Sequence, residues 1–299
     1  MTVASAALIA HTTNLDLVVR HVLAGLGQGV HAGRERGSGV EFSEYRAYAP
    51  GDEWRRVDWK LAARADRYFV REAERDSHVA VWLVLDATAS MLEPSRSVDG
   101  LTKLQYARVQ LACVAALAQR QGDAFGLVVC QGERARVTPA GRGPRQLQRV
   151  LAQLNRLEPD GHLPGTDTLR ASLHFMRSPS VVCVASDFLD WPSPLSEALV
   201  RLRHMRHDVR ALCLHTSAEV DADFDAAPAY RDPEQGGVVY RFGRDVRAAY
   251  ARNREAHFAE VARACRQHDV PLLQARIEQG PGEVLRTWLR AHTAGARAA

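Results

Sequence analysis

Short apolar runs alternate along this chain with longer amphipathic stretches. The apolar runs are rich in β-branched residues and predict buried strands, at residues 79–85, 125–130, 181–185 and 209–214. The longer stretches repeat apolar residues every three or four positions and predict helices, at residues 101–121, 143–157, 195–205 and 246–267. Because strands that alternate with helices form a parallel sheet covered on both faces, we expect an α/β fold with a mostly parallel central sheet.

The chain is expected to form one main domain with a smaller N-terminal segment. Residues 1–77 combine a helical stretch at 3–26 with a block that is rich in charge, Gly, Pro and Trp. This segment holds too little periodic apolar sequence for a core of its own, so we expect it to pack on the main domain, residues 78–299. Within that domain, the polar stretch near 217–243 predicts an excursion that ends in a small hairpin.

Composition and charge argue against several classes of function. The net charge of +4 is spread over 299 residues, whereas nucleic-acid binding favours a patch of one sign. Only Lys60 and Lys103 stand among 39 basic residues, so the chain has no Gly-x-x-x-x-Gly-Lys loop for nucleotide phosphates. The five cysteines lack the spacing of metal or redox motifs. No apolar run reaches the ~18 residues of a membrane span, and the start of the chain does not resemble a signal peptide. We therefore expect a cytoplasmic protein that neither binds nucleic acid nor inserts into a membrane.

The strand expected at residues 79–85 ends in the motif Asp86-x-Thr88-x-Ser90. In an open α/β sheet, ligands bind beyond the carboxyl ends of the strands, so this motif places a carboxylate and two hydroxyls at such an edge. These are hard oxygen ligands of the type that Mg²⁺ or Mn²⁺ prefers. Three oxygens do not fill an octahedral shell, so a metal site requires further ligands from elsewhere in the chain.

Two later segments offer such ligands. A loop rich in Pro and Gly brings Thr166 just before a helix expected at 169–176, and the strand at 181–185 ends in Ser186-Asp187. Other interpretations stay open for each residue. Thr166 alone suits a helix N-cap, a strand-end Asp often serves a turn, and Asp190 is an alternative to Asp187.

The order of these three motifs resembles the metal-ion-dependent adhesion site of von Willebrand factor A domains. That resemblance implies a Rossmann-like domain of this type, with helices on both faces of its sheet. It also implies the set of metal ligands, which would be Asp86, Thr88, Ser90, Thr166 and Asp187. The sequence departs from the family pattern at one place, because the first hydroxyl is commonly Ser and here is Thr88.

A charged aromatic block precedes the first strand and contains the run Tyr48-Ala-Pro50-Gly51-Asp52-Glu53-Trp54-Arg55-Arg56-Val57-Asp58-Trp59. The block resembles the signature of the DUF58 family, bacterial and archaeal proteins that couple it to a von Willebrand factor A domain. Tryptophans with Arg and Asp neighbours occur at binding hot spots, so the candidates for partner binding are Trp54, Arg55, Arg56, Asp58 and Trp59. The alternative is a buried Arg–Asp network that fastens this segment to the main domain.

These resemblances imply an interaction protein that is not an enzyme. Family members resemble accessory factors for MoxR-type AAA+ ATPases, chaperone-like machines that remodel or mature protein complexes. An acidic residue of a client protein would complete the shell of the metal ion. The alternative is a Mg²⁺-dependent phosphoryl-transfer enzyme that uses Asp86 as its nucleophile. It is disfavoured because position 88 is not a second acid and neither lysine lies in a strand-end loop.

Overall fold

The structure is a computed structural model that describes residues 6–7, 9–10, 12, 14–27, 44–47, 69–72, 79–223, 230–231, 239–240 and 246–290. Contacts divide the chain into two compact units. The first joins Met1–Gly29 with Val79–Ala299, and the second is Val30–His78. Within the second unit, β1 (Glu44–Ala47) pairs with β2 (Phe69–Glu72) in an antiparallel sheet. The domain limits expected from the sequence, 1–77 and 78–299, stay a prediction.

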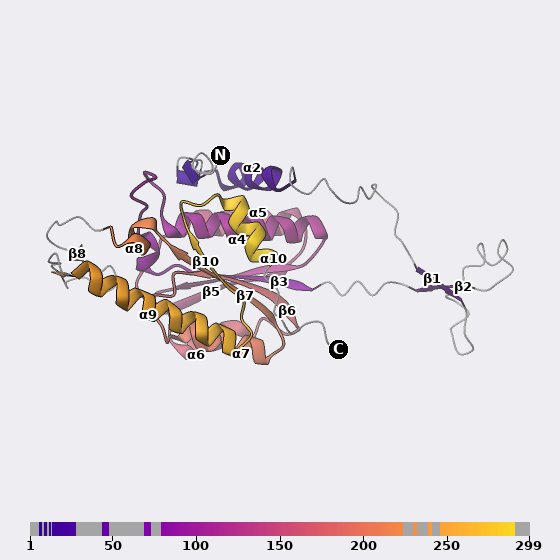
Figure 1. Cartoon of the computed structure of the whole chain (residues 1–299). Coiled ribbons are helices and arrows are strands. Elements are labelled where there is room, and N and C mark those ends of the chain that lie inside the picture. The colour runs from indigo at the N-terminus through magenta and orange to yellow at the C-terminus, as the bar shows by residue number, and fades with distance from the viewer. Residues whose placement is uncertain are drawn as a thin grey trace. The chain divides into compact units, whose positions relative to one another are not determined.

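A six-stranded sheet forms the centre of the first unit (Figure 1). Its order is β10-β7-β6-β3-β4-β5, and all neighbours are parallel except β4 and β5. The strands are β3 (Ala80–Asp86), β4 (Phe125–Gln131), β5 (Arg134–Gly141), β6 (Ser180–Ser186), β7 (Asp208–His215) and β10 (Leu272–Arg276). In chain order this is the 3-2-1-4-5-6 arrangement of doubly wound sheets, with an antiparallel strand at one edge. The expected α/β fold with a mostly parallel sheet is confirmed.

Helices cover both faces of this sheet (Figure 1). One face carries α2 (Leu15–Gly27), α4 (Lys103–Gln121), α5 (Pro144–Asn155) and α10 (Pro281–Arg290). The other face carries α6 (Thr166–Leu173), α7 (Pro194–His204) and α9 (Val246–Gln267). Successive strand residues point to opposite faces, so Leu83 and Leu85 enter the first core while Trp82 and Val84 enter the second. Burial of both faces explains why β3 is an uninterrupted apolar run.

Two segments differ in detail from the elements expected. The short helix expected at 169–176 already begins at Thr166. Asp167 lies in its first turn, where a negative side chain interacts favourably with the positive end of the helix dipole. The expected excursion starts with α8 (Ser217–Asp221), which Thr216 caps, and later contains an antiparallel pair, β8 (Tyr230–Arg231) and β9 (Val239–Tyr240). Among the helices that the structure describes, none is long and apolar enough to cross a membrane.

Gly126 in β4 is a position where the packing of the sheet leaves little room. It pairs with Trp82 of β3, and an added Cβ would approach the Trp82 ring at 2.6 and 2.8 Å and the Thr138 carbonyl oxygen at 2.9 Å. We expect Gly126→Ala to lower the free energy of unfolding by about 2 kcal/mol in urea denaturation, because the core must shift to admit the methyl group. Gly25→Ala in α2 is the matched control, since nothing lies within 4 Å of the added carbon. Equal stability of the two variants would contradict this packing.

Candidate metal centre

Two acidic residues meet at one edge of the central sheet. Asp86 is the last residue of β3, and Asp187 directly follows β6. These strands are parallel neighbours, with Leu85 opposite Ala185, so their carboxyl ends lie side by side. Asp86 and Asp187 are each only 2% exposed. The sheet therefore holds two buried carboxylates at the edge where doubly wound sheets bind ligands.

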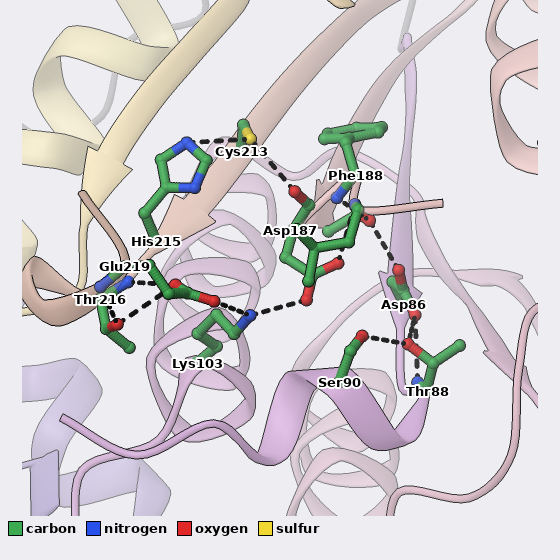
Figure 2. Close-up of polar contacts among 12 residues, drawn as sticks. Asp86, Thr88, Ser90, Lys103, Asp187, Phe188, Cys213, His215, Thr216 and Glu219 are labelled. Atoms are coloured by element: carbon green, nitrogen blue, oxygen red, sulfur yellow. Dashed lines mark hydrogen bonds and ion pairs between the residues drawn. The ribbon is translucent and has the colours of Figure 1, made fainter. Parts of the chain in front are cut away.

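Hydroxyl groups surround the carboxylate of Asp86 (Figure 2). The Thr88 backbone N–H and hydroxyl both donate to Asp86 Oδ1, at 3.0 and 2.8 Å, and Ser186 Oγ donates to Asp86 Oδ2 at 2.6 Å. Thr88 Oγ1 lies 3.1 Å from Ser90 Oγ, which belongs to the short 3₁₀ helix η2 (Ala89–Leu92). The Thr88 hydroxyl therefore lies within hydrogen-bonding distance of both the Asp86 carboxylate and the Ser90 hydroxyl.

The carboxylate of Asp187 has a different partner. Lys103 Nζ, from the first turn of α4, donates to Asp187 Oδ2 at 2.7 Å and to Glu219 Oε1 at 3.0 Å (Figure 2). The side chains of Lys103 and Asp187 are 1% and 3% exposed, so this is a buried ion pair. Burial opposes the charge of Lys103, but Asp187 and Glu219 outweigh burial and raise the pKa of the ammonium group. Lys103 is therefore a fixed cation at this edge.

The backbone after Asp187 is held in an uncommon conformation. Phe188 has a φ of 50°, a left-handed value that is rare for an aromatic residue. Its N–H donates to Ser186 Oγ at 2.9 Å, and its carbonyl oxygen lies 2.9 Å from His257 Nε2. Because Ser186 Oγ also bonds to Asp86, one hydroxyl connects the Asp86 carboxylate to the turn that carries Asp187.

The surroundings of Asp86 disfavour a negative charge when no cation is bound. Burial raises the pKa of Asp86 from 3.8 to about 7, and the charge of Asp187 acts in the same direction. Hydrogen bonds from Ser186 and Thr88 oppose this rise in pKa. In the part of the chain that the structure describes, no Lys, Arg or His forms an ion pair with Asp86. A bound cation would therefore favour the ionised carboxylate.

The donor atoms at this edge suit an oxygen-preferring cation. Over the described ranges, no three His, Cys, Asp or Glu side chains gather as a set of metal ligands. The Asp86 carboxylate with the Thr88 and Ser90 hydroxyls is instead the hard oxygen set that fits Mg²⁺ or Mn²⁺. Asp86, Thr88 and Ser90 would hold such an ion, with Asp187 adding charge from the neighbouring strand.

Thr166 does not join this cluster in the structure. The loop before it does approach the motif, because the Ala89 N–H donates to the Gly161 carbonyl oxygen at 2.9 Å. The Thr166 hydroxyl itself donates to Glu197 Oε2 of α7 at 3.2 Å, and none of its hydrogen bonds to described residues reaches Asp86, Thr88 or Ser90. Its role as a metal ligand stays a prediction.

The other candidates fall outside the cluster or outside the described residues. Asp190 is exposed, whereas Asp187 is buried beside β3, so the geometry favours Asp187 as the acid of this loop. The proposed partner-binding residues lie outside the described residues, and their role stays a prediction; they are Trp54, Arg55, Arg56, Asp58 and Trp59.

Sequence reasoning did not assign Lys103 or Glu219 to this edge. Lys103 lies in a helix rather than in a strand-end loop. Because Thr102 caps α4, Lys103 is the first residue of this helix, and from there its side chain reaches Asp187. Lys103 therefore contacts the site although it lies outside the strand-end loops, as expected from the sequence. One signal was available, because Lys103 is one of two lysines in a chain that otherwise uses arginine.

The raised pKa of Asp86 predicts a particular pH dependence of stability in the metal-free protein. Between pH ~4 and ~7 the folded state keeps a proton on Asp86 that the unfolded chain has lost, so the contribution of this group to stability falls as pH rises. In EDTA, we expect the free energy of unfolding to fall over this range by roughly 3 kcal/mol more in the wild type than in Asp86→Asn. Urea denaturation at a series of pH values measures it. Asp190→Asn, at an exposed acid, should follow the wild type. Parallel curves for the wild type and Asp86→Asn would contradict the prediction.

Several solved structures resemble this chain at low sequence identity. The conserved hypothetical protein BatB from Bacteroides thetaiotaomicron is 14% identical with a TM-score of 0.45, and the match covers 71% of this chain and 99% of that chain. The VWA domain of SpRpn10 is 10% identical with a TM-score of 0.41, and the match covers 70% of this chain and 94% of that chain.

Sequence comparisons identify the family. Uncharacterized proteins of Mycobacterium bovis and Mycobacterium tuberculosis are each 30% identical over 281 residues, which cover 91% of this chain and 86% of the relative. A family model described as "Protein of unknown function DUF58" matches residues 44–260, which include β1, β2 and every candidate metal ligand. This chain belongs to the DUF58 family.

Proposed function

We propose that this chain is a non-enzymatic, metal-dependent protein-interaction factor. The observation that carries the proposal is the convergence of oxygens from Asp86, Thr88 and Ser90 at the carboxyl edge of the sheet, beside Asp187. An oxygen cluster at such an edge can bind a divalent cation, and this binding does not require the protein to catalyse a reaction. The cation, Mg²⁺ or Mn²⁺, would supply an electrophilic position for a carboxylate of a client protein.

Each residue of the site would have a different role in binding the ion. Asp86 would provide the full negative charge, and the Thr88 and Ser90 hydroxyls would provide neutral oxygens that leave part of the positive charge uncompensated. Asp187 would act through water, because Lys103 already occupies its Oδ2. Thr166 would complete the set from the start of α6 once its hydroxyl leaves Glu197.

The proposed partner follows from the family resemblance and from the sequence. The DUF58 signature resembles that of accessory factors for MoxR-type AAA+ ATPases, and the sequence has no nucleotide-phosphate loop of its own. We propose that the chain acts in the cytoplasm beside such an ATPase, in chaperone-like remodelling or maturation of protein complexes. The client would present an Asp or Glu to the metal.

The position of Lys103 makes the phosphoryl-transfer alternative worth testing. Such enzymes use a lysine to balance the charge of the phosphate, and Lys103 does lie beside Asp187. However, Lys103 is buried and its ammonium already pairs with two carboxylates, so little of its charge is available to a phosphate. Residue 88, where a general acid would stand, is a threonine. The interaction role is therefore the better supported of the two.

Asp86→Asn tests the proposed function most cleanly. Alanine is less suitable, because it would leave the buried donors of Thr88 and Ser186 without an acceptor. We expect Asp86→Asn to reduce capture of the MoxR-type ATPase or its client in Mg²⁺ at least about tenfold, because a neutral amide is a weak ligand for a hard dication. The measurement is affinity capture with purified partners, in Mg²⁺ and in EDTA.

Asp190→Asn is the matched control for this experiment, since it removes an exposed acid from the same loop as Asp187. It should bind the partner as the wild type does. Capture that survives both EDTA and Asp86→Asn would contradict a metal bridge. Hydrolysis of a phosphate ester in Mg²⁺, abolished by Asp86→Asn, would favour the enzyme instead.

A further inference from the structure

Lys103 connects the candidate metal centre to a second carboxylate. Its ammonium lies 2.7 Å from Asp187 Oδ2 and 3.0 Å from Glu219 Oε1. The three side chains are 1%, 3% and 13% exposed for Lys103, Asp187 and Glu219 respectively. Because little water screens the buried ammonium of Lys103, its charge acts strongly on any other ion that binds nearby.

The position of the ammonium group is rigid. Thr102 and Gln105 form a reciprocal capping box at the start of α4, and the Lys103 N–H donates to the Glu93 carbonyl oxygen at 3.2 Å. On the other side, Glu219 is held by the Thr216 N–H, which donates to its Oε2 at 2.7 Å. The backbone that carries Lys103 and the carboxylate of Glu219 are therefore both held in place, and the buried ammonium pairs with carboxylates on two sides.

The carboxylate of Asp187 is also held toward Lys103. The Leu189 N–H donates to Asp187 Oδ1 at 3.3 Å, while Lys103 takes Oδ2. In Figure 2, Lys103 and Asp187 form one group of contacts, and Asp86, Thr88 and Ser90 form another beside it. A divalent cation at the second group would meet Asp187 only in competition with the ammonium of Lys103.

We propose that Lys103 is a built-in competing cation that sets a low affinity of this site for divalent metal. The inference rests on the proposed metal site and names the residue that regulates it. Lys103 occupies the carboxylate of Asp187 and repels a second cation, so an ion held at Asp86 gains less from the charge of Asp187 than it would without Lys103. The consequence is that firm metal binding requires the carboxylate of a partner, which couples occupancy of the site to partner binding.

The test compares metal affinity in variants of the full chain. Lys103→Met frees Asp187 but leaves two buried carboxylates without a cation. It is therefore combined with Glu219→Gln, so that the three positions together keep the net charge that they have in the wild type. We expect the double variant to bind Mn²⁺ and Mg²⁺ at least about tenfold more tightly than the wild type in calorimetric titration. Added metal should also raise its melting temperature by more than that of the wild type. A variant damaged only in its fold would bind metal less tightly, not more.

Two single variants complete the design. Glu219→Gln alone keeps Lys103 on Asp187, so its metal affinity should equal or fall below that of the wild type. Lys103→Arg keeps the competing charge and should stay within about threefold of the wild type. Equal or weaker metal binding by a double variant that still unfolds cooperatively, as its melting curve without metal shows, would overturn this inference and leave the metal bridge standing. Absence of Mn²⁺ and Mg²⁺ binding in every form, including the wild type, would overturn both.

Discussion

Two buried carboxylates on neighbouring strands are the constraint on which this edge of the molecule depends. An uncompensated charge in a protein interior costs several kcal/mol, so each must acquire partners. Asp187 acquires a cation, Lys103, at 2.7 Å. Among the residues that the structure describes, Asp86 acquires only hydrogen-bond donors, from Thr88 and Ser186, and burial raises its pKa to about 7. Asp187 is therefore paired with a cation of the protein itself, whereas Asp86 is suited to a cation that binds from the solvent.

The same ion pair organises elements that are distant in sequence. Glu219 serves both Lys103 and the start of α8, because its two oxygens accept from the ammonium and from the Thr216 N–H. His215 at the end of β7 adds no further charge, because burial, Arg254 and Lys103 lower its pKa to about 3. At the carboxyl edge, α4 thus supplies Lys103, α8 supplies Glu219, and the ends of β3, β6 and β7 supply further polar side chains. Burial keeps His215 uncharged, so this histidine adds no cation beside Lys103.

The sequence predicts the frame of this site but not its charge balance. The apolar run of β3 and the later run of β6 are strong local patterns, and parallel pairing then brings Asp86 and Asp187 to one edge. Lys103 and Asp187 are 84 residues apart, and their contact depends on where Thr102 starts α4, which a helical pattern alone does not resolve. Thr166 shows the opposite case: its motif matches the resemblance, but α7 places Glu197 against its hydroxyl. Pairwise contacts between helices are decided by packing, to which hydrophobic periodicity gives no direct access.

We propose that the oxygens of Asp86, Thr88 and Ser90 bind a divalent cation. A crystal structure of the protein grown with Mn²⁺, with anomalous data that locate the ion, would show whether they do. We expect an anomalous peak at metal–oxygen distance, about 2.0–2.3 Å, from the Thr88 and Ser90 hydroxyls and beside Asp86, with Lys103 still paired with Asp187. A fully occupied Mn²⁺ peak elsewhere, with this edge of the sheet lacking anomalous signal, would contradict it.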